Sequence, residues 1–253
     1  WNEMRREALD KLLQKRSEPA PLATKEITLP EYAEHEVGMI PQLAARFETA
    51  AQLPGAEYLA KLRYLILPIR EADAVPQPLR CKTLLELPRA AFGTVEPDTM
   101  RRLAALEGSG FAGVVANNLA QFGYASPLPV FGGLGLNVTN PMSAAEYVCL
   151  GARGLLVQPE TALTAMRAVA PRQKDGTPVP TAALCYGHLP LMLTRACPLR
   201  NVRTSCAGCT HKGKLRDRKG RDFPVRCSAP GSAGMRTVFN PVPLYMGDRL
   251  PEM

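Results

Sequence analysis

Four cysteines lie close together in the last quarter of this 253-residue chain, in the spacing C-x8-C-x2-C-x17-C. A C-x2-C pair brings two thiolates onto one metal through a tight loop, and two further cysteines complete a four-sulfur set. Such a set suits tetrahedral zinc or an iron–sulfur cluster, and the spacing does not separate the two. A redox disulfide, unrelated thiols, and His211 as a substitute zinc ligand are the alternatives. The candidate metal ligands are Cys197, Cys206, Cys209 and Cys227.

Positive charge is concentrated around these cysteines. Ten Lys and Arg residues lie between Arg195 and Arg226, opposed by Asp217 and Asp222, so this segment carries ten minus two, which equals the whole net charge of +8. A local basic patch favours phosphate-bearing partners such as RNA, and a solvated hairpin is the simpler alternative. The candidate RNA-binding residues are Arg200, Arg203, Lys212, Lys214, Arg216, Arg218, Lys219 and Arg221.

The middle of the chain alternates short apolar runs with helical patterns, which is typical of an α/β fold whose parallel sheet is buried on both faces. We expect a TIM-barrel-like β/α repeat, incomplete in this chain. A Rossmann sheet fits less well, because no GxGxxG opens a helix after the first strand, and FGGLGLN is a poor phosphate loop. Strands are predicted at 63–69, 83–88, 113–118, within 129–140, at 153–159 and at 181–192, and helices at 97–110, 141–152 and 160–170.

The flanking segments have a different texture. An amphipathic helix is predicted at 2–16, followed by an irregular, proline-punctuated stretch with a short helix at about 41–51. The tail contains a β-hairpin with a Lys-Gly turn and a short closing strand. We therefore divide the chain into a helical arm and linker (1–61), a barrel-like domain (62–196) and a Cys-rich basic segment (197–253).

Active sites of parallel β/α folds lie at the carboxyl ends of the strands. The substrate-binding candidates there are Asn137, Asn140, Glu160, Tyr186 and His188. His188 and Glu160 are the catalytic candidates, but His188 could equally be a wall residue and Glu160 could favour a helix N-terminus. Further polar residues predicted at strand ends are Asn117, Asn118 and Gln158. The three remaining cysteines are expected to be small buried residues, namely Cys81, Cys149 and Cys185.

The chain has no apolar run long enough for a membrane span, and its charged start does not resemble a signal peptide. Clustered cysteines without an export signal predict a cytoplasmic protein with metal or redox chemistry. Because the chain begins with Trp1 rather than Met, we expect a piece of a longer protein. A partner subunit or an N-terminal barrel part would then complete the site.

Several stretches carry a family resemblance: LNVTNPMSAAEYVCLGARGLLVQPETAL, YGHLPLMLTRACPL, CAGC and LRDRKGRDFPVRC. Together with the opening NEMRREAL, they resemble the long form of the collagenase-like peptidase family U-thirty-two. The resemblance covers residues 2–16 and about 63–246. It departs from the shorter members' Glu-x-Phe-x-His-Gly signature, where this chain has CYGHLPLM.

This resemblance implies a TIM-barrel-like fold and a [4Fe–4S] cluster on the four cysteines at 197, 206, 209 and 227. Bacterial members are implicated in hydroxylation of a ribosomal RNA cytidine, a transfer RNA uridine or ubiquinone precursors. The leading expectation is therefore an iron–sulfur protein of RNA hydroxylation. The alternatives are a collagenase-like peptidase and a zinc-stabilised RNA-binding module without catalysis. No nucleophile–base pair or H-E-x-x-H motif supports the peptidase alternative.

Overall fold

The computed structural model describes residues 1–19, 41–124, 128–200, 206–228 and 234–252. Two units are distinguished, Trp1–Glu31 and Tyr32–Met253, and each is described by itself. The first contains the predicted helix, α1 (Asn2–Ser17), which buries none of its side chains. Among the described residues, no helix has the length and apolar character that crossing a membrane requires.

The second unit is built on a seven-stranded sheet in which every strand is parallel to its neighbours. The strand order follows the chain order, which is the winding of a barrel and not the reversed order of a Rossmann sheet. The strands are β1 (Leu43–Arg46), β2 (Leu62–Pro68), β3 (Thr83–Glu86), β4 (Gly113–Ala116), β5 (Val130–Gly132), β6 (Ala152–Val157) and β7 (Thr181–Ala183).

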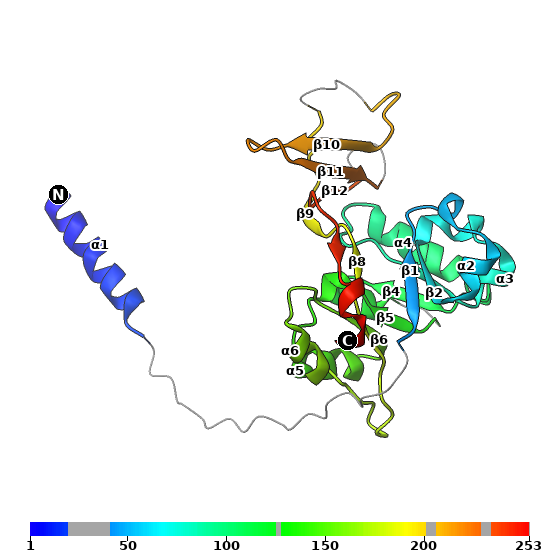
Figure 1. Cartoon of the computed structure of the whole chain (residues 1–253). Coiled ribbons are helices and arrows are strands. Elements are labelled where there is room, and N and C mark those ends of the chain that lie inside the picture. The colour runs from blue at the N-terminus through cyan, green and yellow to red at the C-terminus, as the bar shows by residue number, and fades with distance from the viewer. Residues whose placement is uncertain (20–40, 125–127, 201–205, 229–233, 253) are drawn as a thin grey trace. The chain divides into compact units, whose positions relative to one another are not determined.

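The sheet is curled. The rings of Tyr64 on β2 and Phe131 on β5 meet edge to face with centroids 5.5 Å apart. In a flat sheet, strands three positions apart would be separated by about 14 Å. This contact therefore spans the concave face, and the fold is an incomplete TIM-barrel-like α/β fold, as the sequence predicts (Figure 1).

Short helices and 3-10 turns connect the strands (Figure 1). The α-helices are α2 (Ala56–Ala60), α3 (Gln77–Arg80), α4 (Val95–Ala105), α5 (Pro141–Cys149) and α6 (Leu163–Ala168). The 3-10 turns are η1 (Ala50–Gln52), η2 (Ile69–Ala74), η3 (Leu119–Gly123), η4 (Leu134–Leu136) and η5 (Gly247–Glu252).

Two apolar clusters hold the connecting elements against the sheet. In the first, Leu65 and Leu67 of β2 and Leu85 of β3 pack with Leu103 of α4, and all four are almost fully buried. In the second, members of β6 pack with residues from η4, α5 and the segment after α6; its buried residues are Leu136, Val138, Ala144, Ala152, Leu155, Val157 and Val169. These clusters pack the connecting segments against the sheet and so position the loops at the strand carboxyl ends.

Two sequence predictions are wrong in this part of the chain. Residues 43–46 form a strand paired with β2 and not the short helix predicted at 41–51, because sheet pairing overrides the helix preference of Leu-Ala-Ala-Arg. The single strand predicted at 181–192 is three strands in three sheets: β7, β8 (Tyr186–Gly187) and β9 (Pro190–Thr194). Gly187, at φ 137°, adopts the backbone conformation that allows the chain to leave β8.

The tail forms two antiparallel sheets. The larger has the order β10-β11-β12-β9, with β10 (Lys212–Arg216), β11 (Asp222–Cys227) and β12 (Arg236–Phe239). In the smaller, β13 (Leu244–Tyr245) pairs with β8. The predicted hairpin is confirmed as β10–β11. Its turn is shaped by Asp217, whose Oδ1 accepts hydrogen bonds from the backbone N–H groups of Lys219 (2.8 Å) and Arg221 (2.9 Å).

Candidate functional site

The four cysteines of the sequence pattern gather at the open end of the β10–β11 hairpin. Cys206 and Cys209 form a tight turn directly before β10, in which the Cys209 N–H donates to the Cys206 carbonyl at 3.1 Å. Cys227 ends β11. His211 joins the two sides: its N–H donates to Cys209 Sγ at 3.4 Å, and its carbonyl accepts from the Cys227 N–H at 2.9 Å.

Cys197 belongs to a separate turn that packs against β10 through Leu199. It opens a turn in which the Arg200 N–H donates to the Cys197 carbonyl at 3.1 Å. Two residues further on, Leu199 covers Gly213 of β10 so closely that a Cβ at Gly213 would lie 2.3 Å from Leu199 Cδ1. The glycine therefore allows the Cys197 turn to pack onto the strand that follows the Cys206–Cys209 turn.

The four cysteines are of the residue type that a four-thiolate centre uses. Cys206 is exposed, and Cys197, Cys209 and Cys227 are half-buried, so all four thiols are described and free of disulfides. Within the described ranges, no three His, Cys, Asp or Glu side chains lie close enough together to hold a metal ion. The structure thus places the four thiols at one end of one hairpin without drawing their sulfur atoms together.

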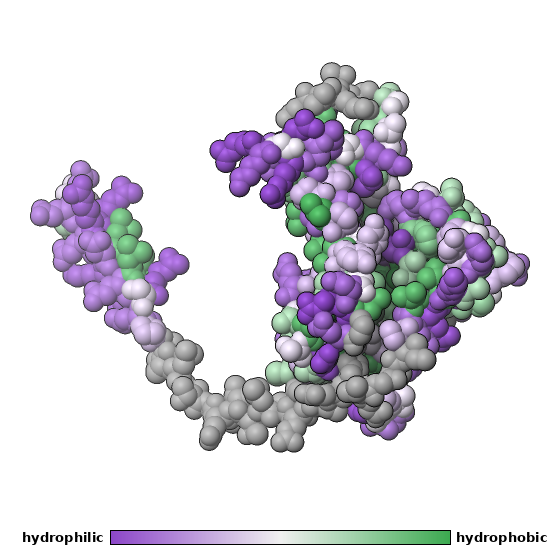
Figure 2. Space-filling view, viewed as in Figure 1, coloured by the Kyte–Doolittle hydropathy of each residue, from purple (hydrophilic) through white to green (hydrophobic). Residues whose placement is uncertain are grey.

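The hairpin separates its charged and apolar side chains. Lys212, Lys214 and Arg216 alternate along β10 on the exposed side, while Gly213 and Leu215 between them are half-buried. On β11, Arg226 is the register partner of Lys212. The hairpin consequently presents a strongly hydrophilic surface, seen at its tip in Figure 2.

One carboxylate partly neutralises this surface. Asp222 pairs with Arg216 (2.7 Å) and Lys214 (2.6 Å). Hydrogen bonds from Arg216 and then from Lys214 hold the pKa of Asp222 well below its usual range. The remaining turn cations, Arg218, Lys219 and Arg221, are exposed. Of the other RNA-binding candidates, Arg200 is exposed in the Cys197 turn, and Arg203 lies outside the described residues.

Amide side chains link the carboxyl ends of the parallel strands. Asn117, just after β4, is buried; its Nδ2 donates to the Leu87 carbonyl at 3.1 Å and its Oδ1 accepts from the Gly135 N–H at 3.2 Å. The Gln121 side chain accepts from the Asn117 N–H at 2.6 Å and donates to the Pro88 carbonyl at 2.7 Å. These bonds join the loops after β3, β4 and β5.

The same row of amides continues to β6. Gln158, just after β6, donates through Nε2 to the Leu134 carbonyl (3.3 Å) and to Asn137 Oδ1. Asn137 has a left-handed backbone, at φ 53°. Asn140 caps α5, its Oδ1 accepting from the Ser143 N–H at 2.9 Å. The structure therefore brings Asn137 and Gln158 together. Asn140 has a structural role as the N-cap of α5, so its Oδ1 is already engaged within the protein.

The other candidates lie after β6 and β7. Glu160 is exposed in the turn after β6, and the helix predicted from 160 begins only at Leu163. Tyr186 is exposed on β8. His188 is exposed as well, and its Nδ1 lies 2.7 Å from the backbone carbonyl of Asn240, which can only accept. The ring therefore carries its hydrogen on Nδ1, and Asn240 fixes the ring orientation.

Sequence reasoning missed a charged group at the ends of β1 and β3. Arg46 ends β1, and its Nε donates to Glu86 Oε2, at the end of β3, at 2.7 Å. Burial opposes the charge of Arg46, but Glu86 and Glu48 together raise its pKa above the ordinary value. Arg89 lies three residues past Glu86, and burial and then Arg46 lower its pKa against the effect of Glu86. The run Glu-Leu-Pro-Arg directly after an apolar strand was the available signal.

The prediction that the isolated cysteines are buried is wrong for two of them. Cys81 and Cys149 are exposed, because each lies at the C-terminal end of a helix, α3 and α5 respectively, on its solvent side. Cys185 is half-buried in the link between β7 and β8.

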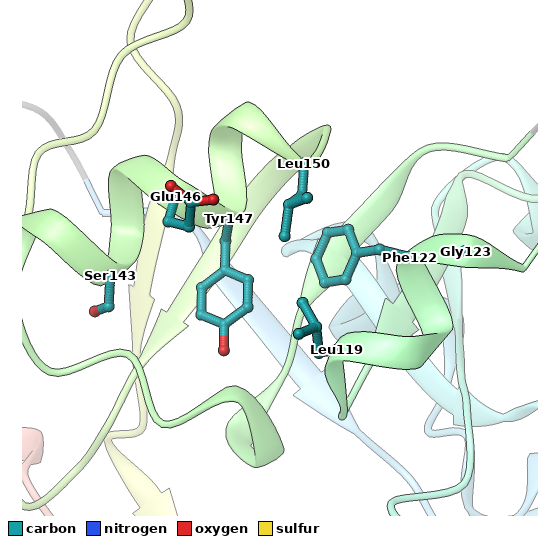
Figure 3. Close-up of a pocket in the computed structure, with 7 residues that line it drawn as sticks. All are labelled: Leu119, Phe122, Gly123, Ser143, Glu146, Tyr147 and Leu150. Atoms are coloured by element: carbon teal, nitrogen blue, oxygen red, sulfur yellow. The ribbon is translucent and has the colours of Figure 1, made fainter.

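An open, mostly apolar groove lies between η3 and α5. The rings of Phe122 and Tyr147 stack in it with centroids 5.8 Å apart, and the Tyr147 hydroxyl donates to the Leu136 carbonyl (Figure 3). None of the residues singled out from the sequence lines it. Its lining residues are Leu119, Phe122, Gly123, Ser143, Glu146, Tyr147 and Leu150.

Comparisons with known proteins add one structural likeness. No protein-family model and no curated protein matches the chain. Among solved structures, one described as "The Structure of the U32 Peptidase Mk0906" is similar to this chain, with a TM-score of 0.45 and 12% sequence identity over 63% of this chain and 74% of that one. The fold assignment rests on the strand order and curvature of this chain's own sheet.

Proposed function

We propose that this chain is an iron–sulfur protein that binds RNA through the β10–β11 hairpin and acts in RNA hydroxylation. The observation that carries the proposal is the arrangement of the hairpin: four thiols at its open end and cations along its exposed side and turn. The choice of a ribosomal RNA cytidine or a transfer RNA as substrate comes from the family resemblance of the sequence.

Cys197, Cys206, Cys209 and Cys227 would hold a [4Fe–4S] cluster, which supplies electron transfer when bound. The hairpin itself supplies the binding surface. Its exposed Lys and Arg side chains can contact successive phosphates, since guanidinium and ammonium groups pair with phosphate oxygens. Zinc on the same four thiols would make the segment a structural module without this chemistry.

Anaerobic purification followed by iron, sulfide and zinc analysis tests the cofactor. We expect brown protein with iron and acid-labile sulfide in cluster stoichiometry. Colourless protein with one zinc per chain would overturn the cluster and leave a zinc-stabilised RNA-binding module. Mass spectrometry of nucleosides from RNA incubated with the loaded protein, dioxygen and a reductant tests hydroxylation, in which one oxygen atom enters a C–H bond of the target nucleoside and the other leaves as water with two electrons from the reductant. Cleavage of casein or gelatin that persists through purification would instead favour a peptidase.

Replacing Asp222 by Asn is expected to strengthen RNA binding. The substitution releases Lys214 and Arg216 from their shared carboxylate, so one more cation is free to contact phosphate. The dependence of log affinity on log salt for single-stranded RNA should steepen by about 0.7. Fluorescence anisotropy with a labelled RNA oligonucleotide at several salt concentrations measures both quantities.

Asp175→Asn is the matched control, because it changes the net charge equally in the loop between α6 and β7. An equal gain in both variants would show that the hairpin surface is not where RNA binds. The pH must stay near neutral in this comparison. At neutral pH Asp222 is ionised, because its pKa in the folded chain is lowered from the ordinary value of 3.8. Its ion pairs therefore stabilise the hairpin fully above pH 3.8, and this stabilisation is lost as the pH falls through the lowered pKa of the folded chain.

A further inference from the structure

The loop between β3 and α4 carries an exposed aromatic ring that contacts Arg195, the residue directly after β9. Phe92, in this loop, is 47% exposed. The guanidinium of Arg195 lies over its ring, 4.8 Å from the ring centroid. Arg195 follows β9 directly and precedes Cys197 by two residues. This contact therefore places Arg195, two residues before the first cysteine of the pattern, at the carboxyl end of β3, the edge where parallel β/α folds bind their ligands.

The position of Arg195 is set by backbone contacts. Its carbonyl accepts a hydrogen bond from Nη1 of Arg236 at 2.7 Å, and the Arg236 residue is buried. Thr194, just before it, pairs with Arg236 in the β9–β12 ladder. The guanidinium of Arg195, by contrast, belongs to an exposed residue and can leave the ring without disturbing these bonds.

The same loop holds Arg89, a cation with no side-chain hydrogen bond among the described residues. Arg89 is half-buried. Its neighbour Arg46 differs, because Arg46 is bound to both Glu86 and Glu48. Burial lowers the pKa of Arg89 and outweighs the attraction of the nearby Glu86 carboxylate, which is already paired with Arg46. An arginine in this state is suited to an anionic ligand.

We propose that Phe92, Arg195 and Arg89 form a subsite for one unpaired nucleotide, with the base stacked on the Phe92 ring and a phosphate on Arg89. This inference rests on the proposed RNA function and names the part of the surface that takes the target nucleotide. Aromatic rings and arginine planes are the surfaces on which unstacked bases bind. The subsite selects single strands, because the bases of a duplex already stack on each other.

The first test is Phe92→Leu in the full chain, with a short fluorescein-labelled oligocytidylate as the probe. Leucine keeps the apolar contact but removes the ring. Since stacking on an aromatic side chain contributes about 1–3 kcal/mol per base, we expect affinity to fall about 10-fold while the salt dependence stays unchanged. Binding of a labelled RNA duplex should not change.

Tyr58→Leu is the matched control for this variant. Tyr58 is an exposed ring under a cation, Lys61, at 5.7 Å, on α2 and outside the β3–α4 loop. The Tyr58→Leu variant should bind the oligocytidylate with the affinity of the wild type. Equal affinity of the Phe92→Leu variant and the wild type would overturn the subsite while leaving RNA binding by the hairpin intact. A wild-type chain that binds no RNA would overturn both proposals.

A spectroscopic test reports on the ring itself. The chain has one tryptophan, Trp1, so Phe92→Trp in a Trp1→Phe background places the only indole in the subsite. Its fluorescence should be quenched by saturating oligocytidylate and not by heparin, a polyanion without bases. Equal quenching by both would show that the ring senses charge at the hairpin and not a stacked base.

Arg89→Gln completes the test with a readout that a merely structural role would not give. Because Arg89 is half-buried without a hydrogen bond, its removal should leave the thermal midpoint unchanged or slightly raised while oligocytidylate affinity falls several-fold. A lower midpoint together with unchanged affinity would assign Arg89 to the fold and overturn its place in the subsite.

Discussion

Serine in place of Cys209 is expected to abolish iron and sulfide binding, which is the largest effect that any single substitution should have on this protein. Cys209 belongs to the C-x2-C turn, and a cluster that loses one of four thiolates loses the geometry of the pair as well. Iron and sulfide per chain, measured after anaerobic reconstitution, should fall to the background of the unreconstituted protein.

Cys149→Ser is the control for that experiment, since Cys149 is an exposed thiol on α5 and not part of the four-cysteine pattern. It should keep the full iron content. The β10–β11 hairpin is held by its own backbone ladder, so RNA binding by the Cys209→Ser variant should keep its salt dependence. Full iron content in the Cys209→Ser variant would contradict the assignment of the four ligands.

Alanine at Gly135 should destabilise the fold more than any other glycine substitution near the strand ends. A Cβ at this position would lie 2.0 Å from the Asn117 carbonyl oxygen and 2.9 Å from its carbonyl carbon, and backbone atoms cannot swing away. The loop after β5 must then separate from β4, which breaks the bond between the Gly135 N–H and Asn117. Overpacking and an unsatisfied buried amide together should cost about 3 kcal/mol of unfolding free energy.

Urea unfolding followed by circular dichroism measures this effect as a lower midpoint at unchanged slope. Gly123→Ala is the control, because nothing lies within 4 Å of a Cβ there. Its unfolding free energy should stay within about 0.5 kcal/mol of the wild type. Equal midpoints for the two variants would show that the strand-end loops move apart without cost.

The parallel sheet was predictable from the sequence because its strands are short, apolar and separated by helical patterns. Apart from the β7–β9 region, each predicted strand corresponds to one observed strand, and the strand order is that of the barrel-like fold expected from the sequence. β1 was not predictable, since Leu-Ala-Ala-Arg gains strand structure only by pairing with β2. The division of 181–192 into separate strands depends on distant pairing partners, because β8 pairs with β13 and β9 pairs with β12.

The same contrast holds for the candidate site. Cysteine spacing and the charge count located the hairpin, because those signals are local in sequence. Arg46 pairs with Glu86, and Arg195 contacts Phe92, although the partners lie far apart in the chain. A local sequence pattern does not predict which distant residues will pair. Two of the three glycines of FGGLGLN, Gly133 and Gly135, have a structural cause that only the folded strand order reveals, which is their close approach to Asn117.

The β9–β12 ladder has a consequence for the history of the chain. Thr194 and Arg236 are register partners, so the whole excursion between them, residues 195–235, leaves and re-enters the fold at one point. Segments whose ends are neighbours can be inserted, lost or exchanged without redesigning their host. The four-cysteine pattern and a net charge of +8, equal to that of the whole chain, belong to one such excursion, so a lineage could acquire or discard both in a single recombination event.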